Sequence, residues 1–302
     1  MQRATIGLCN SARFVTGCKA KTYDHQPSAL FMDILGDDFP YSSTALVGKH
    51  ALVCGASKGI GAATAKMLAK CGANVTVAAR NEQALEDLVH ELSSLGDGTH
   101  GMVSVDLEDA EEVAQSVRSI LESRGPIHIL INNAGGPPGG PLLNNSTSDF
   151  EGPFRRHLHA SHILVQHVAP MMEQEGFGRI IQIISTSVKE PIPNIGLSNT
   201  LRGAMASWAK SLSNELAPCI TINNVLPGFT NTSRLQSLST SIQDKTGKSA
   251  EDVMNQWMSQ VPIQRLIDPL ETASAIVFLT LPASGGIRGV SLAVDGGRLR
   301  SI

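Results

Sequence analysis

The sequence is short of aromatic residues, and of tyrosine above all. Aromatic residues make up 4% of the 302 residues, and the two tyrosines, Tyr23 and Tyr41, both lie within the first 50. From residue 42 to the end the chain contains no phenol. A reaction that relies on tyrosine as its proton donor therefore lacks that donor in the main part of the chain.

Other shortages exclude whole classes of protein. Lys and Arg number 24 against 27 Asp and Glu, so no basic excess is available for nucleic-acid phosphates, and we expect no nucleic-acid partner. No apolar run approaches the roughly 20 residues that span a bilayer, so we expect no membrane partner. Five cysteines without a CxxC pair disfavour a disulfide framework or a zinc site. Reduced thiols of this kind favour a cytoplasmic location.

The composition is that of a folded chain, with 42% hydrophobic and 17% charged residues. From residue 47, short apolar runs alternate with segments of helical periodicity. Apolar strands separated by helices indicate βαβ units and a parallel sheet that is buried on both faces. We therefore predict an α/β, doubly wound domain over residues 47–302, with strands near 51–54, 75–78, 102–105, 127–131, 179–184 and 220–225.

Residues 1–46 are predicted to form an N-terminal extension, disordered or removed by processing. Residues 1–31 carry four Lys or Arg, are rich in Ser, Thr and Ala, and have no acid before Asp24. That composition is typical of an organellar transit peptide. A disordered tail, or an upstream start before Met32, explains it equally simply, and both alternatives stay open.

The first predicted strand runs into a glycine-rich loop with the spacing G-x-x-x-G-x-G. Such a loop between a strand and a helix lets the backbone approach a pyrophosphate, which the free N–H groups of the helix then bind. We predict a Rossmann-type dinucleotide site here; the alternative is a turn that only packs the helix close to the strand. The predicted cofactor-binding residues of the loop are Gly55, Ser57, Lys58, Gly59, Ile60 and Gly61.

The end of the second predicted strand indicates which dinucleotide binds. NAD-binding folds place Asp or Glu about 20 residues after the glycines, to bind the ribose 2′-hydroxyl. Here residues 78–81 read Ala-Ala-Arg-Asn, with no carboxylate. Arg80, with Lys58 near it, favours the 2′-phosphate of NADP. The alternative is that Arg80 is a solvent-exposed arginine at the start of a helix.

Five motifs in order resemble the short-chain dehydrogenases/reductases, and most closely 3-oxoacyl-acyl-carrier-protein reductases. They are residues 55–61, Asp106, residues 132–135, Pro227-Gly228 and residues 295–297, and the resemblance covers residues 47–302. It implies an NADP-dependent oxidoreductase that forms a homotetramer or homodimer. It places Asp106 and Leu107 by the adenine, Asn133, Ala134 and Gly135 by the adenosine ribose, and Pro227, Gly228 and Thr232 by the nicotinamide.

The chain departs from the family at the catalytic positions. The family uses Asn, Ser, Tyr and Lys; here Ser185 matches the serine, while Ser198 and Arg202 stand at the tyrosine and lysine positions. The asparagine position falls at His157 or next to it. Ser198 is a poor acid, and Arg202 can bind ribose hydroxyls but cannot join a proton relay. The chain thus resembles a divergent subgroup that lacks the tyrosine.

Three readings follow from this departure. The first is an NADP-dependent oxidoreductase that acts on a carbonyl or hydroxyl group of a small molecule or an acyl thioester. Ser185 would polarise the carbonyl, and His157, His159 or a water would donate the proton. The second is a nucleotide-binding sensor or oligomer partner without catalysis. The third is a different reaction, such as a lyase or epimerase step, on the same fold.

Two further segments, residues 157–167 and residues 229–262, have an unusual composition. His157, His159, His162 and His167 crowd one stretch but lack the convergent spacing of a metal site, so we expect no metal. Residues 229–262 are polar, contain a helix predicted to end near Trp257, and match the mobile lid of the family.

Overall fold

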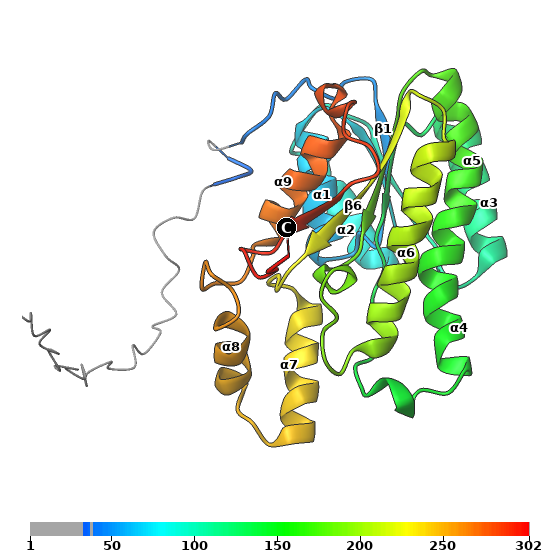
Figure 1. Ribbon diagram of the computed structural model, residues 1–302. Coiled ribbons are helices and arrows are strands. Elements are labelled where there is room, and N and C mark those ends of the chain that lie inside the picture. The colour runs from blue at the N-terminus through cyan, green and yellow to red at the C-terminus, as the bar shows by residue number, and fades with distance from the viewer. Residues whose placement is uncertain (1–32, 37–38, 302) are drawn as a thin grey trace, which may run out of the picture.

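A seven-stranded parallel sheet forms the centre of the protein. The computed structural model describes residues 33–36 and 39–301 (Figure 1). The strand order is β3-β2-β1-β4-β5-β6-β7, and every pairing is parallel, which confirms the doubly wound α/β fold. The strands are β1 (His50–Cys54), β2 (Asn74–Ala79), β3 (His100–Ser104), β4 (Ile129–Asn132), β5 (Gly178–Ile183), β6 (Ile220–Pro227) and β7 (Ser291–Val294).

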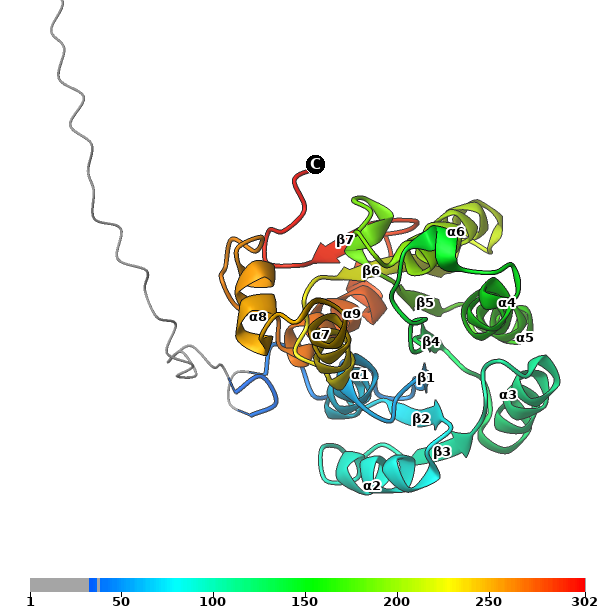
Figure 2. The ribbon, with the colours of Figure 1, turned by 90° about the horizontal axis from the view of Figure 1, so that it is seen from below.

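Helices cover both faces of this sheet, as the view in Figure 2 shows. One face packs against α1 (Gly59–Lys70), α2 (Glu82–Leu92) and α9 (Pro269–Thr280). The other packs against α3 (Ala110–Arg124), α5 (Ala160–Gln174) and α6 (Gly196–Glu215). Because each strand meets a helix layer on both sides, β1, β4 and β5 are buried along their whole length, which explains their continuous apolar sequence.

The order of the strands reverses between β1 and β4, where the chain returns from β3 to start the second half of the sheet. At such a point the loops after neighbouring strands diverge to opposite faces, and the crevice between them is where ligands bind in this type of fold. The loops after β1 and β4 carry the glycine-rich segment and residues 132–135 that the sequence analysis singled out.

Residues 39–46 pack against this body, although we expected them to belong to the extension. The Tyr41 hydroxyl donates to the Ser274 carbonyl oxygen of α9 at 2.6 Å, and Leu46 is fully buried. Burial raises the pKa of Tyr41. The Tyr41 phenol therefore makes a structural contact with α9. The division of the chain at residue 46 stays a prediction; residues 1–31 and Tyr23 lie outside the described residues.

Helix α4 (Ser148–Phe154) continues without a break into a π-helical turn (Arg155–His159) and then into α5. The helical segment before β5 therefore begins at Ser148, and its residues Arg155–His159 have π geometry. Turns of this kind are rare and frequently lie at functional sites. Here the turn directs the imidazole of His157 toward the carboxyl edge of the sheet, where it meets Gly135.

Helices α7 (Ser233–Thr246) and α8 (Ala250–Met258) form a pair beyond the sheet, below it in Figure 1. Gly247, in the left-handed conformation at φ +70°, ends α7, and a Ser249–Asp252 capping box starts α8. The sequence predicted one helix near Trp257; this glycine divides the segment into two.

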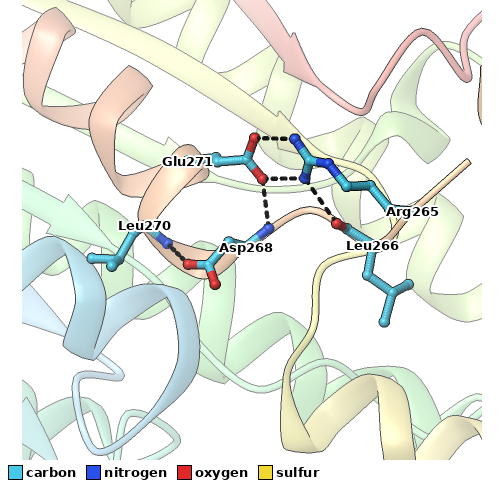
Figure 3. A network of polar contacts seen from close by, with 5 residues as sticks. All are labelled: Arg265, Leu266, Asp268, Leu270 and Glu271. Carbon is cyan, nitrogen blue, oxygen red and sulfur yellow. Dashed lines mark hydrogen bonds and ion pairs between the residues drawn. The ribbon is translucent and has the colours of Figure 1, made fainter. Parts of the chain in front are cut away.

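A network of polar contacts anchors the loop after α8 to the start of α9 (Figure 3). Arg265 donates to both oxygens of Glu271, at 2.6 and 2.7 Å, and Glu271 also accepts from the Asp268 backbone N–H. Asp268 caps α9 by accepting from the Leu270 backbone N–H. The bidentate contact fixes the position at which the α7–α8 pair rejoins the body.

Candidate functional site

A cleft of about 1530 Å³ opens at the carboxyl edge of the sheet, between the body and the α7–α8 pair. It brings together nearly all residues predicted from the sequence. The predicted cofactor residues that line it are Gly55, Ser57, Lys58, Gly59, Ile60, Arg80, Asp106, Leu107, Asn133, Ala134, Gly135, Arg202, Pro227, Gly228 and Thr232. Ser185 and Ser198 line it as well, while Gly61 and His157 do not.

The glycine-rich loop leaves no room for larger side chains. Gly55 and Gly59 both have φ +60°, a conformation that favours glycine. A Cβ at Gly61 would stand 2.4 Å from the Gly55 carbonyl oxygen. Gly61 therefore does not line the cleft but lets α1 approach the loop closely.

The start of α1 suits an anion. Its N-cap residue, Lys58, makes no side-chain capping hydrogen bond, so the first N–H groups of the helix are not capped by a side chain. Such groups, at the positive end of the helix dipole, bind phosphate. The loop and helix thus fit a dinucleotide pyrophosphate, as the sequence predicted.

The loop after β4 is tied to the glycine-rich loop. The side-chain amide of Asn133 donates to the Gly55 carbonyl oxygen at 3.1 Å. A Cβ at Gly55 would stand 2.5 Å from the Asn133 carbonyl oxygen, so the two loops pack backbone to backbone. On the α7 side of the cleft, Thr232 approaches Gly59. A Cβ added at Gly59 would lie 3.2 Å from the threonine methyl carbon. These contacts set the width of the cleft.

Two arginines lie at the end of the cleft beyond β2. Arg80 forms an ion pair with Asp106 at 3.7 Å, and Arg156 forms one with Glu108. Burial lowers the pKa of Arg156, and the positive charge of Arg80 lowers it further. Arg80 follows β2 and could be predicted from the sequence. Arg156 could not, because it comes from the π-helical turn and reaches this end only through the tertiary fold.

Ser185 is held in place just beyond β5. Its hydroxyl oxygen accepts from the Ser187 backbone N–H at 3.1 Å, which leaves its own O–H free to donate into the cleft. Ser198 and Arg202 are four residues apart on α6, so they share one face of the helix. Three of the four side chains predicted at family catalytic positions, Ser185, Ser198 and Arg202, therefore line the same cleft.

His157 lies behind Arg202 rather than in the cleft. It is 4% exposed and lines a separate small cavity. Its Nε2 lies 3.0 Å from the Gly135 carbonyl oxygen, which can only accept, so Nε2 carries the proton. Nδ1 then accepts from Nη1 of Arg202 at 3.3 Å.

The surroundings keep His157 neutral. Burial lowers the pKa of His157 well below its usual value, and the positive charge of Arg202 lowers it further. A neutral imidazole with both nitrogens engaged is badly placed to donate a proton to a substrate. His159, the other candidate donor, is exposed and does not line the cleft either.

The opposite end of the cleft combines aromatic and cationic side chains. Phe229 stacks on Trp257 of α8, with ring centroids 5.3 Å apart. Arg298 lies over the Phe229 ring and donates to the Thr186 hydroxyl at 3.1 Å. Arg234, in the first turn of α7, donates to the Pro137 carbonyl oxygen across the cleft mouth at 2.5 Å. The sequence pattern did not identify Arg298 or Arg234 as site residues.

From the sequence we expected neither a metal site nor a membrane-spanning segment. Over residues 33–36 and 39–301, no group of three His, Cys, Asp or Glu side chains could hold a metal ion. No helix in the described part of the chain has the length and apolar character to cross a bilayer. Cys54, Cys71 and Cys219 carry free thiols, and burial raises the pKa of the first two to about 12.

Comparison with known proteins agrees with this geometry. The family model described as "Enoyl-(Acyl carrier protein) reductase" matches residues 55–298. The chain belongs to the short-chain dehydrogenase/reductase family.

Among similar curated proteins, the short-chain reductase protein NovJ of Streptomyces niveus is 32% identical over 82% of this chain and 93% of its own. The 3-oxoacyl-[acyl-carrier-protein] reductase FabG of Vibrio harveyi is 32% identical over 83% of this chain and 98% of its own. Among solved structures, L-sorbose reductase of Gluconobacter frateurii, complexed with NADPH and L-sorbose, matches with a TM-score of 0.81 and 26% identity. That match covers 86% of this chain and 100% of the other.

Proposed function

We propose that the protein is an NADP(H)-dependent oxidoreductase that interconverts a carbonyl and a hydroxyl group. The observation that carries the proposal is the placement of Ser185 and Arg202 in the same cleft as the glycine-rich loop. Arg80 and Arg156, at the far end, suit the 2′-phosphate of NADP, and the family relative crystallised with NADPH supports the same cofactor.

When bound, the reduced cofactor supplies a hydride to the carbonyl carbon and leaves as NADP⁺, while the carbonyl oxygen takes up one proton. The Ser185 hydroxyl donates a hydrogen bond to that oxygen, oriented by the Ser187 backbone N–H. Arg202, buried and cationic, stabilises negative charge as it develops on the oxygen, an effect that is large in a site with little water. Burial lowers its pKa only to about 10, so its charge persists at neutral pH.

The proton must come from a group other than a phenol. Ser198 occupies the tyrosine position, and its side chain is too short and too weakly acidic to act alone. Because the cleft mouth is open to solvent, a water beside Ser198 is the donor we propose. General acid catalysis contributes roughly 10²–10⁴-fold, so turnover through water will be slower than in relatives with the tyrosine.

The names of the relatives make 3-oxoacyl thioesters one candidate substrate class. Assembly as a homotetramer or homodimer and a cytoplasmic location stay predictions. The two other readings from the sequence, a sensor without turnover and a lyase or epimerase, are outcomes of the same experiment.

That experiment measures NADPH binding and NADPH oxidation separately. The purified chain is titrated with NADPH and then incubated with a panel of ketones, 3-oxo thioesters and oxo acids, and the loss of absorbance at 340 nm is followed. We expect binding, and oxidation with part of the panel that falls at least tenfold in Ser185→Ala. Tight binding without oxidation would favour the sensor, and product formation without net NADPH consumption would favour a lyase or epimerase.

A further inference from the structure

The cleft holds a group of cations at the end away from Arg80, namely Arg234, Lys248 and Arg298, and the sequence motifs do not account for them. Resting on the proposed function, we propose that the substrate carries an anionic group, a carboxylate or a phosphate, bound by Arg234 and Arg298 beside the reacting carbonyl. The reductase would thus act on oxo acids or oxo phosphates in preference to neutral ketones.

Arg234 and Arg202 approach the same point of the cleft from different elements. A Cβ at Gly136 would lie 3.6 Å from Nη2 of Arg202 and 3.8 Å from Nη2 of Arg234. Burial lowers the pKa of Arg202, and the positive charge of Arg234 lowers it further. Arg202 and Arg234 carry like charges in the same part of the cleft, so they repel each other. A bound anion would relieve that repulsion.

Arg298 reaches the site from the opposite side. Its Nη1 donates to Thr186, the residue that follows Ser185. Its Nε is buried and has no hydrogen-bond partner among the described residues. Asp295 holds the turn that presents it, because its carboxylate accepts from the backbone N–H groups of Gly297 and Leu299. Because Arg298 lines the cleft and contacts Thr186, its guanidinium is available to a ligand oxygen next to Ser185.

Structural arginines in the same protein look different. Arg288 uses Nε, Nη1 and Nη2 on the carbonyl oxygens of Ser213, Ala217 and Leu216, which saturates the end of α6. By contrast, Arg234 makes one hydrogen bond, to Pro137. Most of its donors are left for a ligand, and the planar guanidinium is the group best suited to grip a carboxylate or phosphate with two bonds.

No described Asp or Glu side chain lines this end of the cleft; the Asp295 carboxylate lies behind it and is bonded to the backbone of its own turn. Among the described residues that line the cleft, the one carboxylate is Asp106, which pairs with Arg80 at the other end. Lys248 adds a further cation, and its amine donates to the neutral Gln256. Two arginines outside the cleft do pair with carboxylates: Arg155 with Glu151 and Arg265 with Glu271. Arg234, Arg298 and Lys248 therefore bring positive charge to the substrate end without a carboxylate partner among the described residues that line the cleft.

The remaining lining shapes the rest of the substrate. Apolar side chains from the loop before α6 and from the α7–α8 pair face the same space; they are Ile192, Leu238, Ile242, Val253 and Trp257. An anion held next to Ser185 with an apolar remainder toward α7 and α8 fits a small oxo acid with an aliphatic or aromatic tail.

The experiment compares matched charged and neutral probes. Phenylpyruvate is compared with its methyl ester, acetoacetate with methyl acetoacetate, and dihydroxyacetone phosphate with dihydroxyacetone, each by kcat/KM with NADPH. We expect at least one anion to exceed its neutral partner by tenfold or more. The acid and phosphate pairs show which anion is preferred. Equal or better turnover of every neutral partner would overturn the proposal.

Binding supplies a readout that does not depend on turnover. Phenylacetate and phenylacetamide are titrated into the complex with NADP⁺ by calorimetry. We expect phenylacetate to bind and its affinity to fall about 10- to 100-fold in Arg298→Gln and in Arg234→Gln, as hydrogen bonds to charged groups are of that strength. Arg118→Gln, an exposed arginine on α3, is the control and should leave both affinities unchanged.

The failures of the two proposals are distinguishable. If NADPH does not bind the wild-type chain, the proposed function fails. If NADPH binds but no anionic probe binds or reacts, the anion site fails alone. If Arg234→Gln and Arg298→Gln weaken NADPH binding as strongly as phenylacetate binding, these arginines hold the cofactor and the anion site is likewise overturned.

Discussion

Nη1 of Arg202 lies 3.3 Å from Nδ1 of His157, and the imidazole in turn meets the Gly135 carbonyl oxygen at 3.0 Å. The same Nη1 also donates to the Ile183 carbonyl oxygen at 3.2 Å. The buried histidine thus connects the loop after β4 to the guanidinium that stands at the family lysine position. We infer that His157 positions the guanidinium of Arg202.

Replacing His157 should therefore affect catalysis more than cofactor binding. In His157→Ala, Arg202 loses an acceptor and one constraint on its orientation. We expect kcat to fall about tenfold, with a smaller change in the Kd for NADPH. His157→Asn, which keeps an acceptor oxygen, should recover part of the loss. His159→Ala, an exposed neighbour on the same turn, is the control, and an equal loss in both alanine variants would contradict the positioning role.

Gly61→Ala should destabilise the protein and weaken NADPH binding together. The new Cβ would stand 2.4 Å from the Gly55 carbonyl oxygen, so the glycine-rich loop must shift. Overpacking of this kind costs about 1–3 kcal/mol. Gly203→Ala in α6, where nothing lies within 4 Å of the new Cβ, should instead stabilise by roughly 0.5–1 kcal/mol. Thermal unfolding with and without NADPH measures both effects.

Arg80→Gln should reduce the preference for NADPH over NADH. The guanidinium is exposed and its contact with Asp106 is long, so a 2′-phosphate can compete for it. We expect the Kd for NADPH to rise about tenfold and that for NADH to change little. Arg156→Gln should act in the same direction. An equal rise for both cofactors would place Arg80 in a structural role.

Acid should destabilise the protein through its buried histidines. Burial, with the charge of Arg124, lowers the pKa of His50 to about 4, while the unfolded chain has a pKa near 6.5. Between these values the unfolded state binds more protons, so stability is complete above pH 6.5 and falls as the pH drops toward 4. His50 alone should remove about 2 kcal/mol of unfolding free energy between pH 7 and pH 5. Denaturant unfolding at several pH values tests this, and His50→Gln should flatten the slope.

Much of the fold could be predicted because its signals are local. The strand runs and the glycine spacing depend on residues that are close in sequence, and the resemblance to the family located Ser185 and Ser198. The short strand β7 and helix α9 gave no comparable signal. The packing of Tyr41 on Ser274, 233 residues away, depends on tertiary structure alone.

The cations of the cleft show the same limit. Arg156, Arg234 and Arg298 come from three distant segments, and in the sequence each looks like any exposed arginine. Only the fold shows that they face one cleft. Their hydrogen bonds also differ from those of a structural arginine: Nε of Arg298 has no partner among the described residues, whereas Arg288 is fully bonded. The state of His157 was equally hidden, since its tautomer depends on contacts with Gly135 and Arg202.

We propose that this cleft transfers a hydride although no tyrosine from the described part of the chain lines it. The most direct measurement uses NADPH that carries deuterium at both C4 positions of the nicotinamide, with the oxo-acid panel as acceptors and mass spectrometry of the products. The account predicts a hydroxy product that carries one deuterium on the former carbonyl carbon, at a yield that drops in Ser185→Ala. Tight binding of NADPH with no deuterium in any product would contradict it.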